Sequence, residues 1–242
     1  MRTILQKSRG SSVSCVGPGL GMSMAKRFGS EGFRVALVSR SDARHEGYLK
    51  ELAAQGIDAT AYAADVTDRA RLKSVLAEIA GDSDIEVAYY GPGPTQQPIP
   101  LTEIDSTTAQ SAFDWVWPAV DMVHEVLPAM LDRGTGALLF AGGLSSVRPM
   151  PMLGHLALPS AALRNYAVTL NAALADRGVY AATLTIGRLI ERGDIHAMVT
   201  ADPGRFGSLE GRTLDPDDLA ATAWEMYRAR DRAEAVFDLF SG

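Results

Sequence analysis

The 242-residue sequence predicts a single doubly wound α/β domain spanning residues 1–242, with a mainly parallel sheet of about seven strands and helices on both faces. Short β-rich segments alternate with helical patterns along most of the chain, which is typical of parallel strands joined by crossover helices. The segment Phe33–Ser39 has the character of a strand buried on both faces. Hydrophobic residues make up 47% of the chain, enough for one sizeable core.

Cap and turn residues divide the chain into its elements. Gly32 is a typical helix stop, Asp68 and Asp215 are typical N-caps, and Pro118 should interrupt a long helical region because it lacks an N–H and its ring clashes. The expected strands are Ser12–Val16, Phe33–Ser39, Ile57–Ala63, Ile85–Tyr90, Ala137–Ala141, Val179–Ile186 and Ala235–Leu239. The expected helices are Gly21–Glu31, Ala43–Gln55, Asp68–Ala80, Thr102–Leu131, Ser160–Ala175 and Asp215–Arg228.

Composition and charge argue against several classes of protein. The net charge of −6 and the pI of about 5.2 disfavour a nucleic-acid or anionic-membrane surface and favour a small-molecule partner. Cys15 is the single cysteine and cannot form an internal disulfide, and the histidines lack ligand spacing, so we expect no metal site. No apolar stretch approaches the roughly 20 residues that cross a bilayer. The first residues lack the apolar core of a secretion signal, so we expect a cytoplasmic protein.

A glycine-rich turn joins the first expected strand to the first expected helix. It reads Cys15-Val-Gly17-Pro-Gly19-Leu-Gly21, and its free N–H groups would face a ligand at the helix N-terminus. This arrangement suits a pyrophosphate, although glycines also occur where a turn only needs a positive φ. We therefore interpret Gly17, Gly19, Leu20 and Gly21 as dinucleotide-binding residues.

The end of the second strand selects the dinucleotide. About 20 residues past the glycine turn, where an acid would bind the 2′-hydroxyl of NAD, stand Ser39 and Arg40. The planar guanidinium of Arg40 is suited to a 2′-phosphate, and Ser39 adds a small hydroxyl. NADP(H) is therefore favoured over NAD(H). The alternative is that Arg40 is a solvated loop charge; Arg44 is a second, weaker candidate.

These motifs resemble those of the short-chain dehydrogenase/reductase family over essentially the whole chain. The family's TGxxxGxG motif falls on residues 14–21, with Cys15 in place of the first glycine. Asp65 and Val66 match the pair that contacts adenine in the family, although Asp65 could also be only a turn residue. Gly91 falls in the segment that replaces the family's Asn-Asn-Ala-Gly turn, and residues 185–190 replace its Pro-Gly turn.

The resemblance also implies a catalytic Ser, Tyr and Lys, the last two in a YxxxK motif, and a supporting Asn in the preceding helix. None of these four residues can be located in this sequence. Alignment puts Gly143 at the serine position, Leu156 at the tyrosine, Ser160 at the lysine and Trp115 at the asparagine. Every lysine lies in the first third of the chain and no YxxxK exists. Pro159 predicts a helix that begins near it, which would leave Leu156 on the preceding loop.

Three residues are candidates for replacing the lost chemistry. Histidine exchanges protons near neutral pH, so His155 is a candidate for donating or accepting the proton. The hydroxyl of Ser145, like that of the adjacent Ser146, could hydrogen-bond to a substrate oxygen. Tyr90 ends a strand near the expected position of the nicotinamide. Their alternatives are a loop histidine, turn serines and a packing tyrosine. A further hypothesis is an apolar substrate pocket, covered by a lid at Asp194–Phe206 and lined by Trp115, Trp117, Met150, Met152 and Leu153. The alternative is that these five residues pack in the core or at an interface.

Three functions follow from this pattern. The first, which we favour, is an atypical NADP(H)-dependent oxidoreductase that acts on a small carbonyl or alcohol and positions the cofactor without the usual Tyr-Lys pair. The others are a non-redox enzyme, such as a cyclase, dehydratase or isomerase, and an inactive small-molecule-binding or partner protein. The resemblance also implies a homodimer or homotetramer that pairs the helices in Ser106–Leu131 and Ser160–Ala175.

Overall fold

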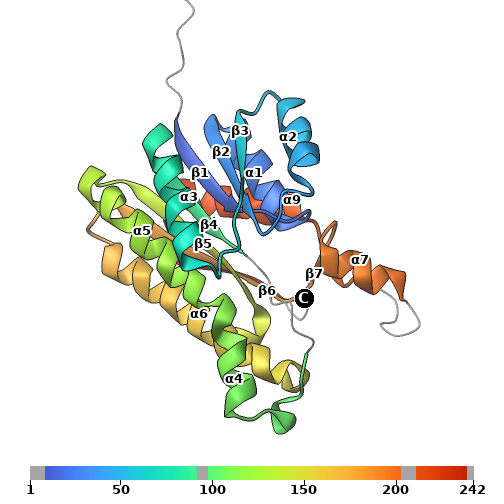
Figure 1. The fold of residues 1–242 in the computed structure, drawn as a ribbon. Coiled ribbons are helices and arrows are strands. Elements are labelled where there is room, and N and C mark those ends of the chain that lie inside the picture. The colour runs from blue at the N-terminus through green and yellow to red at the C-terminus, as the bar shows by residue number, and fades with distance from the viewer. Residues whose placement is uncertain (1–8, 92–97, 203–210, 239–242) are drawn as a thin grey trace, which may run out of the picture.

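The computed structural model describes residues 9–91, 98–202 and 211–238 and has the predicted doubly wound architecture (Figure 1). A seven-stranded sheet has the order β3-β2-β1-β4-β5-β6-β9, and every pair of neighbours is parallel. Its strands are β1 (Arg9–Cys15), β2 (Phe33–Ser39), β3 (Ala59–Ala63), β4 (Ile85–Tyr90), β5 (Gly136–Gly143), β6 (Val179–Ile186) and β9 (Glu234–Phe237). The chain adds strands on one side of β1 as far as β3 and then on the other side from β4 onward, and in doubly wound folds ligands bind beyond the carboxyl ends of the strands at such a switch point.

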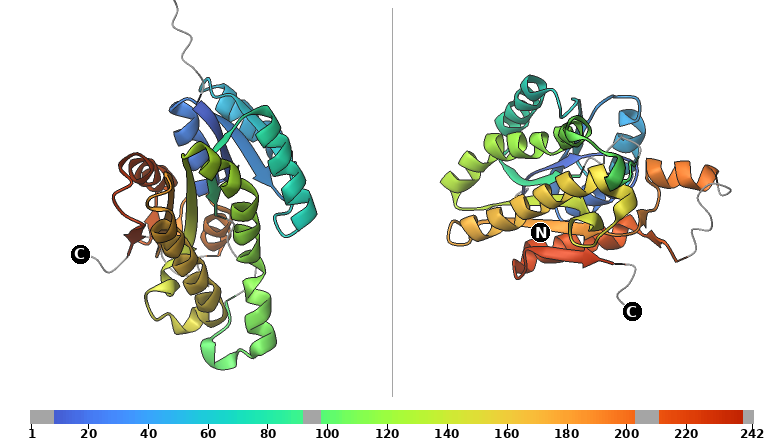
Figure 2. Two further views of the ribbon diagram at one scale, coloured as in Figure 1. Left: turned by 90° about the vertical axis from the view of Figure 1, so that its left-hand side faces the viewer. Right: turned by 90° about the horizontal axis from the view of Figure 1, so that it is seen from below.

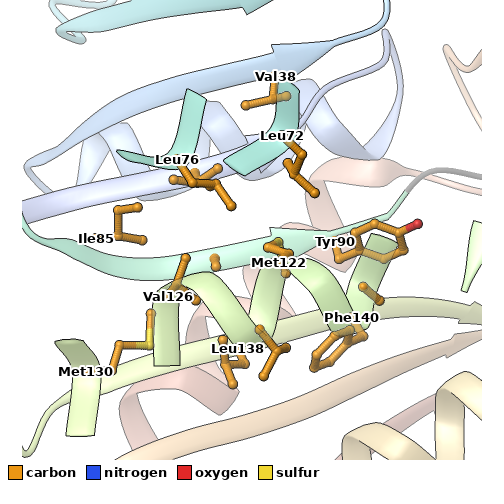
Figure 3. Packing of buried hydrophobic residues seen from close by; sticks show 14 of the residues in the cluster. Val38, Leu72, Leu76, Ile85, Tyr90, Met122, Val126, Met130, Leu138 and Phe140 are labelled. Atoms are coloured by element: carbon orange, nitrogen blue, oxygen red, sulfur yellow. The ribbon is translucent and has the colours of Figure 1, made fainter. Parts of the chain in front are cut away.

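Helices cover both faces of this sheet (Figure 2). On one face lie α3 (Arg69–Asp82), α5 (Trp117–Arg133) and α6 (Gly154–Leu174), and on the other α1 (Leu20–Ser30), α2 (His45–Ala53) and α9 (Pro216–Ala229). Successive residues of a strand point to opposite faces of the sheet. Ala88 and Tyr90 of β4 pack into the core under α3, α5 and α6, where Figure 3 shows Tyr90, whereas Val87 and Tyr89 pack into the core under α1 and α9. Burial on both faces explains why the strands are so apolar in sequence.

Three of the predicted helix-end residues have the predicted role in the structure. The carboxylate of Asp68 accepts a hydrogen bond from the backbone N–H of Arg71 and caps α3, and Asp215 caps α9 by accepting from the N–H of Asp217. Gly32 follows α1 with φ +93°, a left-handed conformation that glycine adopts without strain. These local signals, together with the exact bounds of β2, β4 and β6, were readable from sequence.

The long helical region before β5 is two helices. A short helix, α4 (Ser106–Ala112), is followed by a 3-10 turn at Phe113–Trp115, and Pro118 lies in the first turn of α5. The predicted interruption at Pro118 is therefore confirmed, in the form of a restart, because proline is well tolerated where no intrahelical N–H bond is required.

The predicted start of α6 is wrong. The helix begins at Gly154 and continues through Pro159, so His155 and Leu156 lie in its first turn. Tertiary packing overrides the local preference of proline, because His155 and Leu156 are both buried. Gly154 permits the early start: a Cβ there would lie 2.2 Å from the Cα of Leu101.

Between β6 and α9 the chain forms elements that were not predicted from sequence. Two short strands, β7 (Leu189–Ile190) and β8 (Thr213–Leu214), pair in parallel, and α7 (Asp194–Ala201) follows β7. Figures 1 and 2 show α7 projecting beyond the sheet, and none of its residues is buried. The described helices include none with the length and apolar character to cross a membrane.

Candidate dinucleotide and catalytic site

The glycine turn lies at the carboxyl end of β1 and leads directly into α1. A Cβ at Gly21 would lie 2.7 Å from the carbonyl oxygen of Cys15, so this glycine allows the helix to pack against the strand. The N–H groups of Met22 and Ser23 bond to carbonyl groups of the turn, but those of Leu20 and Gly21 have no acceptor within the described residues. Nothing lies within 4 Å of a Cβ built on Gly17. Free donors beside open space at a helix N-terminus fit an anionic phosphate.

Cys15 links the glycine turn to the turn after β4. The backbone N–H of Gly91 donates to its thiol, while burial of the sulfur raises the pKa of Cys15 to about 12. The thiol therefore stays protonated at neutral pH and is a structural contact. Gly91 itself leaves no room for a side chain, because a Cβ there would lie 2.0 Å from the hydroxyl oxygen of Tyr89.

The end of β2 places the residues predicted for the 2′-phosphate on the surface. Arg40 is exposed and makes no hydrogen bond or ion pair within the described residues. The hydroxyl of Ser39 donates to the carbonyl oxygen of Ser41 at 2.9 Å and contacts Nε2 of His45 at 2.7 Å. Ser39 is thus engaged with its own loop, and His45, which the sequence analysis did not select, lies beside the same position.

Asp65 and Val66 lie beyond β3 at the same edge of the sheet. Oδ1 of Asp65 accepts hydrogen bonds from the N–H and the hydroxyl of Thr67, at 2.9 and 2.8 Å, and the bond from the N–H is the main reason that the pKa of Asp65 is lowered. Val66 packs against the core. The structure thus shows the turn role of Asp65, while its contact with adenine stays a prediction.

A segment that we call the strap, residues 191–194, lies against the glycine turn. A Cβ at Gly19 would lie 3.2 Å from the carbonyl oxygen of Glu191 and from the Cα of Gly193. Arg192 adopts φ +64°, a strained left-handed conformation for a residue with a side chain. The strap thus covers Gly19 and leaves the side at Gly17 open.

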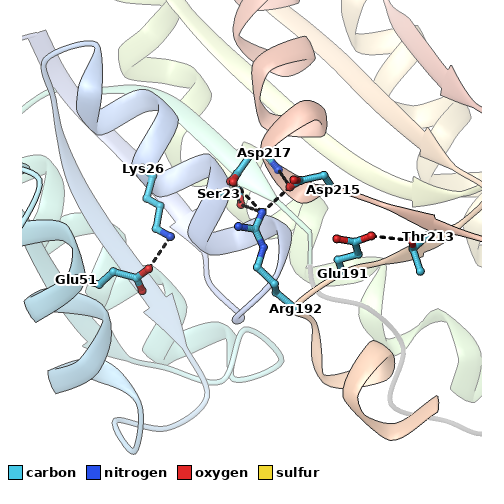
Figure 4. Close-up of polar contacts among 8 residues, drawn as sticks. All are labelled: Ser23, Lys26, Glu51, Glu191, Arg192, Thr213, Asp215 and Asp217. Atoms are coloured by element: carbon cyan, nitrogen blue, oxygen red, sulfur yellow. Dashed lines mark hydrogen bonds and ion pairs between the residues drawn. The ribbon is translucent and has the colours of Figure 1, made fainter. Parts of the chain in front are cut away.

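Ion pairs hold the strap to the start of α9, which is hydrogen-bonded to α1 (Figure 4). Nη2 of Arg192 lies 2.6 Å from a carboxylate oxygen of Asp215 and 2.9 Å from one of Asp217. Asp217 also accepts a hydrogen bond of 2.6 Å from the buried hydroxyl of Ser23 on α1, and despite partial burial its pKa is lowered by Ser23 and Arg192. Thr213 of β8 donates to Glu191 at 2.7 Å.

At the catalytic end, the structure brings together Gly143, Ser145 and Ser160. A Cβ at Gly143 would lie 3.5 Å from the hydroxyl oxygens of both serines, so the three positions share one small region at the end of β5. Leu156 and Ser160 are four residues apart on α6 and therefore share a helical face. The two positions that the sequence analysis aligned with the family's Tyr and Lys thus lie on one side of α6.

Tyr90 is tied to the core. Its hydroxyl donates to the backbone carbonyl of Trp115, and burial raises its pKa above the usual range. A tyrosine whose hydroxyl is buried and already bonded is poorly placed to exchange a proton with a substrate. The structure places Tyr90 in the packing role that the sequence analysis held as its alternative.

His155 is buried on the first turn of α6 with one nitrogen bonded and one free. Its Nδ1 accepts a hydrogen bond of 3.1 Å from the backbone N–H of Ile99. An accepting Nδ1 carries no proton, so Nε2 carries it in the neutral ring. Within the described residues, Nε2 has no partner, and neither do the buried side-chain atoms Ser146 Oγ and Trp115 Nε1. Buried polar atoms without partners cost stability, and they mark a place where a ligand or water completes the bonding.

Two of the five apolar residues predicted for a substrate pocket are exposed in this structure. Trp117 and Met152 expose 53% and 66% of their surface, and Trp117 stacks on Phe113 with ring centroids 5.7 Å apart. Of the predicted lid at Asp194–Phe206, the first part forms the strap end and α7, whereas residues 203–206 lie outside the described ranges. The described residues hold no group of three or more potential metal ligands.

A family model described as short chain dehydrogenase matches residues 13–189, more than half of the chain. The chain belongs to the short-chain dehydrogenase family. The match begins in β1 and ends in β7, so it includes the glycine turn, the carboxyl ends of β4 and β5, and all of α6.

Relatives in this family include proteins of different kinds. Inactive hydroxysteroid dehydrogenase-like protein 1 of Homo sapiens is 24% identical over 190 residues, which cover 75% of this chain and 56% of the relative. The very-long-chain 3-oxoacyl-CoA reductase of Neurospora crassa is 28% identical over 166 residues, which cover 66% of this chain and 50% of the relative. The chain therefore spans about half the length of the curated relatives it matches.

Solved structures show the same fold. The NADPH-bound short chain oxidoreductase from Pseudomonas aeruginosa PAO1, which contains an atypical catalytic center, superposes with a TM-score of 0.84. The two chains are 16% identical, and the superposition covers 96% of each. At this identity the likeness concerns the architecture, which is a short-chain dehydrogenase sheet with helices on both sides.

Proposed function

We propose that this short-chain dehydrogenase is an NADP(H)-dependent oxidoreductase that acts on a small carbonyl or alcohol without a Tyr-Lys pair. The observation that carries the proposal is the contrast between the two ends of the site. The glycine turn presents free N–H groups of Leu20 and Gly21 beside open space at Gly17. At the other end, the positions for the usual proton-handling side chains hold Gly143, Leu156 and Ser160.

The residues present fit the cofactor. The N–H groups of Leu20 and Gly21 would hold the pyrophosphate, and Arg40 would hold the 2′-phosphate because its guanidinium is exposed and unpaired within the described residues. Asp65, Val66 and Gly91 lie beyond β3 and β4 at the same carboxyl edge of the sheet, where the adenine and nicotinamide ends would extend. Bound NADP(H) would supply or accept the hydride. An NADPH-bound relative with an atypical catalytic center supports this assignment.

His155 is the group that we assign to the substrate oxygen. The N–H of Ile99 fixes the tautomer, so His155 presents a hydrogen-bond donor at Nε2. A donor aimed at a carbonyl oxygen stabilises the negative charge that develops there when the carbon is reduced. The hydroxyl of Ser145 serves as a second donor, and water delivers the proton. Tyr90 is excluded from this role by its bond to Trp115.

Fluorescence titration of the purified chain with NADPH and NADH, followed by an assay of NADPH oxidation against a panel of small aldehydes and ketones, tests the proposal. We expect NADPH to bind more tightly than NADH and at least one carbonyl to be reduced. Absence of binding of either dinucleotide would overturn the cofactor assignment. Binding of NADPH without oxidation on any carbonyl would overturn the assigned reaction.

That last outcome would favour a second function, a binding or partner protein that has kept the fold and the nucleotide site. The loss of the Ser, Tyr and Lys side chains favours it, and so does the similarity to a human protein described as inactive. The two functions share the dinucleotide site and differ only in turnover, so the same titration and assay separate them.

We also propose a cytoplasmic homodimer or homotetramer that pairs α5 and α6 of neighbouring subunits. These helices carry exposed apolar residues in this structure, namely Trp117 and Val120 on α5 and Leu158 on α6, which expose 53%, 37% and 44% of their surface. An interface would remove that surface from water. Light scattering after size-exclusion chromatography tests the assembly, and a monomeric mass would contradict it.

A further inference from the structure

A bidentate ion pair joins the loop after β2 to α7. Arg44 lies in the loop after β2 and Asp194 is the first residue of α7, 150 residues away in sequence. Nη1 and Nη2 of Arg44 donate to the two carboxylate oxygens of Asp194 at 2.9 and 2.8 Å. This paired geometry uses an N–H edge of the planar guanidinium, which can bind a carboxylate or a phosphate group in the same way.

The strap brings Asp194 to this place. Its preceding residues lie against Gly19, and Arg192 is held by Asp215 and Asp217 on α9. The strap therefore contacts the glycine turn through Glu191 and Gly193 and the loop after β2 through Asp194. The pKa of its carboxyl is lowered, chiefly by the hydrogen bonds from Arg44 and also by the charges of Arg44 and Arg40. One carboxylate is thus stabilised by both arginines of this loop.

We propose that Asp194 is a specificity-determining residue, which sets how strongly the site prefers a nucleotide with a 2′-phosphate by occupying Arg44. The proposal rests on the proposed function, because it concerns the same dinucleotide site. A 2′-phosphate that is to bond with Arg44 must displace the Asp194 carboxylate from the guanidinium. The 2′-hydroxyl of NADH does not need the charge of Arg44, so Asp194 opposes NADPH and leaves NADH nearly unaffected.

Asp194→Asn in the full chain, titrated with NADPH and with NADH, tests the proposal. Both side chains of the ion pair are more than half exposed, at 55% and 65%, so the fold should not depend on it. We expect the affinity for NADPH to rise about threefold or more, as for the loss of one exposed charge interaction, while the affinity for NADH changes much less. Asp176→Asn, at an exposed site after α6, makes the same charge change away from the site and should leave both affinities unchanged.

The Arg44→Ala background decides whether the effect runs through the ion pair. We expect Asp194→Asn to give little gain in NADPH affinity once Arg44 is absent, because the residue that Asp194 occupies is gone. Three results would overturn the inference while NADPH binding itself stands. Asp194→Asn could raise NADPH affinity equally with and without Arg44, could change the affinities for NADPH and NADH equally, or could leave NADPH affinity unchanged in the chain that retains Arg44. If neither nucleotide binds to the original chain nor to the Asp194 variant, the proposed function fails together with the inference.

Discussion

Gly21 packs so closely against β1 that a Cβ at this position would lie 2.7 Å from the carbonyl oxygen of Cys15 and 2.8 Å from the Cα of Val16. Both of these neighbours are backbone atoms, which cannot turn aside as a flexible side chain can. This contact fixes how closely the first turn of α1 packs against the end of β1. It thereby orients the N–H groups of Leu20 and Gly21, which have no acceptor within the described residues. A packing requirement and a binding requirement therefore meet at one glycine.

Gly21→Ala should lower the free energy of unfolding by about 1–3 kcal/mol, because the added methyl forces α1 away from β1. Gly17→Ala is the matched control for stability: it makes the same change in the same turn, where nothing lies within 4 Å. Urea denaturation of both variants measures the effect. Equal stability of the two variants would show that the helix and the strand are not in close contact at Gly21.

Arg40→Asp should weaken NADPH binding by about tenfold or more, the usual loss for a hydrogen bond to a charged group, and weaken NADH binding far less. The reason is that Arg40 is exposed and makes no hydrogen bond or ion pair within the described residues, so its N–H groups are available to a 2′-phosphate. Arg177→Asp, at an exposed site after α6, controls for the change in net charge. Equal weakening of the two nucleotides would assign Arg40 to general electrostatic attraction and remove it from the phosphate site.

His155 has a structural contact and a proposed chemical one, and two substitutions separate them. His155→Ala should lower the free energy of unfolding by about 1–3 kcal/mol, because it leaves the N–H of Ile99 without its acceptor. His155→Asn places an amide oxygen near the Nδ1 position and removes the Nε2 donor. We expect this variant to recover part of the stability and to lose carbonyl reduction through kcat, with NADPH binding kept. Full kcat in His155→Asn would exclude Nε2 from the reaction.

Glu234 of β9 should make folding sensitive to acid. Bidentate hydrogen bonds from Arg164 lower the pKa of Glu234 against the effect of its partial burial, and Thr185 adds a further bond. The folded-state pKa of Glu234 lies below the unfolded value of about 4.5. The ionised carboxylate therefore stabilises the fold fully above the unfolded pKa, and this contribution is lost as the pH falls through the lower, folded-state pKa.

Denaturation curves between neutral pH and pH values below 4.5 measure this contribution. Glu234→Gln should be less stable than the original chain at neutral pH, and the difference between them should shrink in acid. Glu225→Gln, on the exposed face of α9, is the control and should leave the pH profile unchanged. A constant difference between the Glu234 variant and the original chain at every pH would contradict the assigned ionisation.

Local signals made most of the fold predictable from sequence. The Asp68 and Asp215 caps, the Gly32 stop and the restart at Pro118 depend on neighbours a few residues away, and the structure agrees with all of them. The start of α6 was wrong for the opposite reason. It depends on the close contact of Gly154 with Leu101, a residue from a distant part of the chain, and no local pattern reports such a contact.

The candidate site was predictable in part. The glycine turn and Arg40 could be read because a binding loop is contiguous in sequence. The partner of Arg44 could not be read, because Asp194 lies 150 residues away and reaches it only through the strap. The hydrogen bond from Ile99 to His155 is likewise a long-range contact, which only the folded chain reveals. The approach of Ser160 to Gly143 was implied by the family resemblance, which aligned both residues with catalytic positions.

The eight residues of α7 leave every side chain at least partly in water. Such a segment contributes little to the core, so amino-acid changes along it cost the sheet and its covering helices almost nothing. Mutations can therefore change this part of the chain, including Asp194 beside Arg44, while the rest of the domain folds as before. Under the proposed role of Asp194, such changes would alter the preference between the two nucleotides in descendants of this protein.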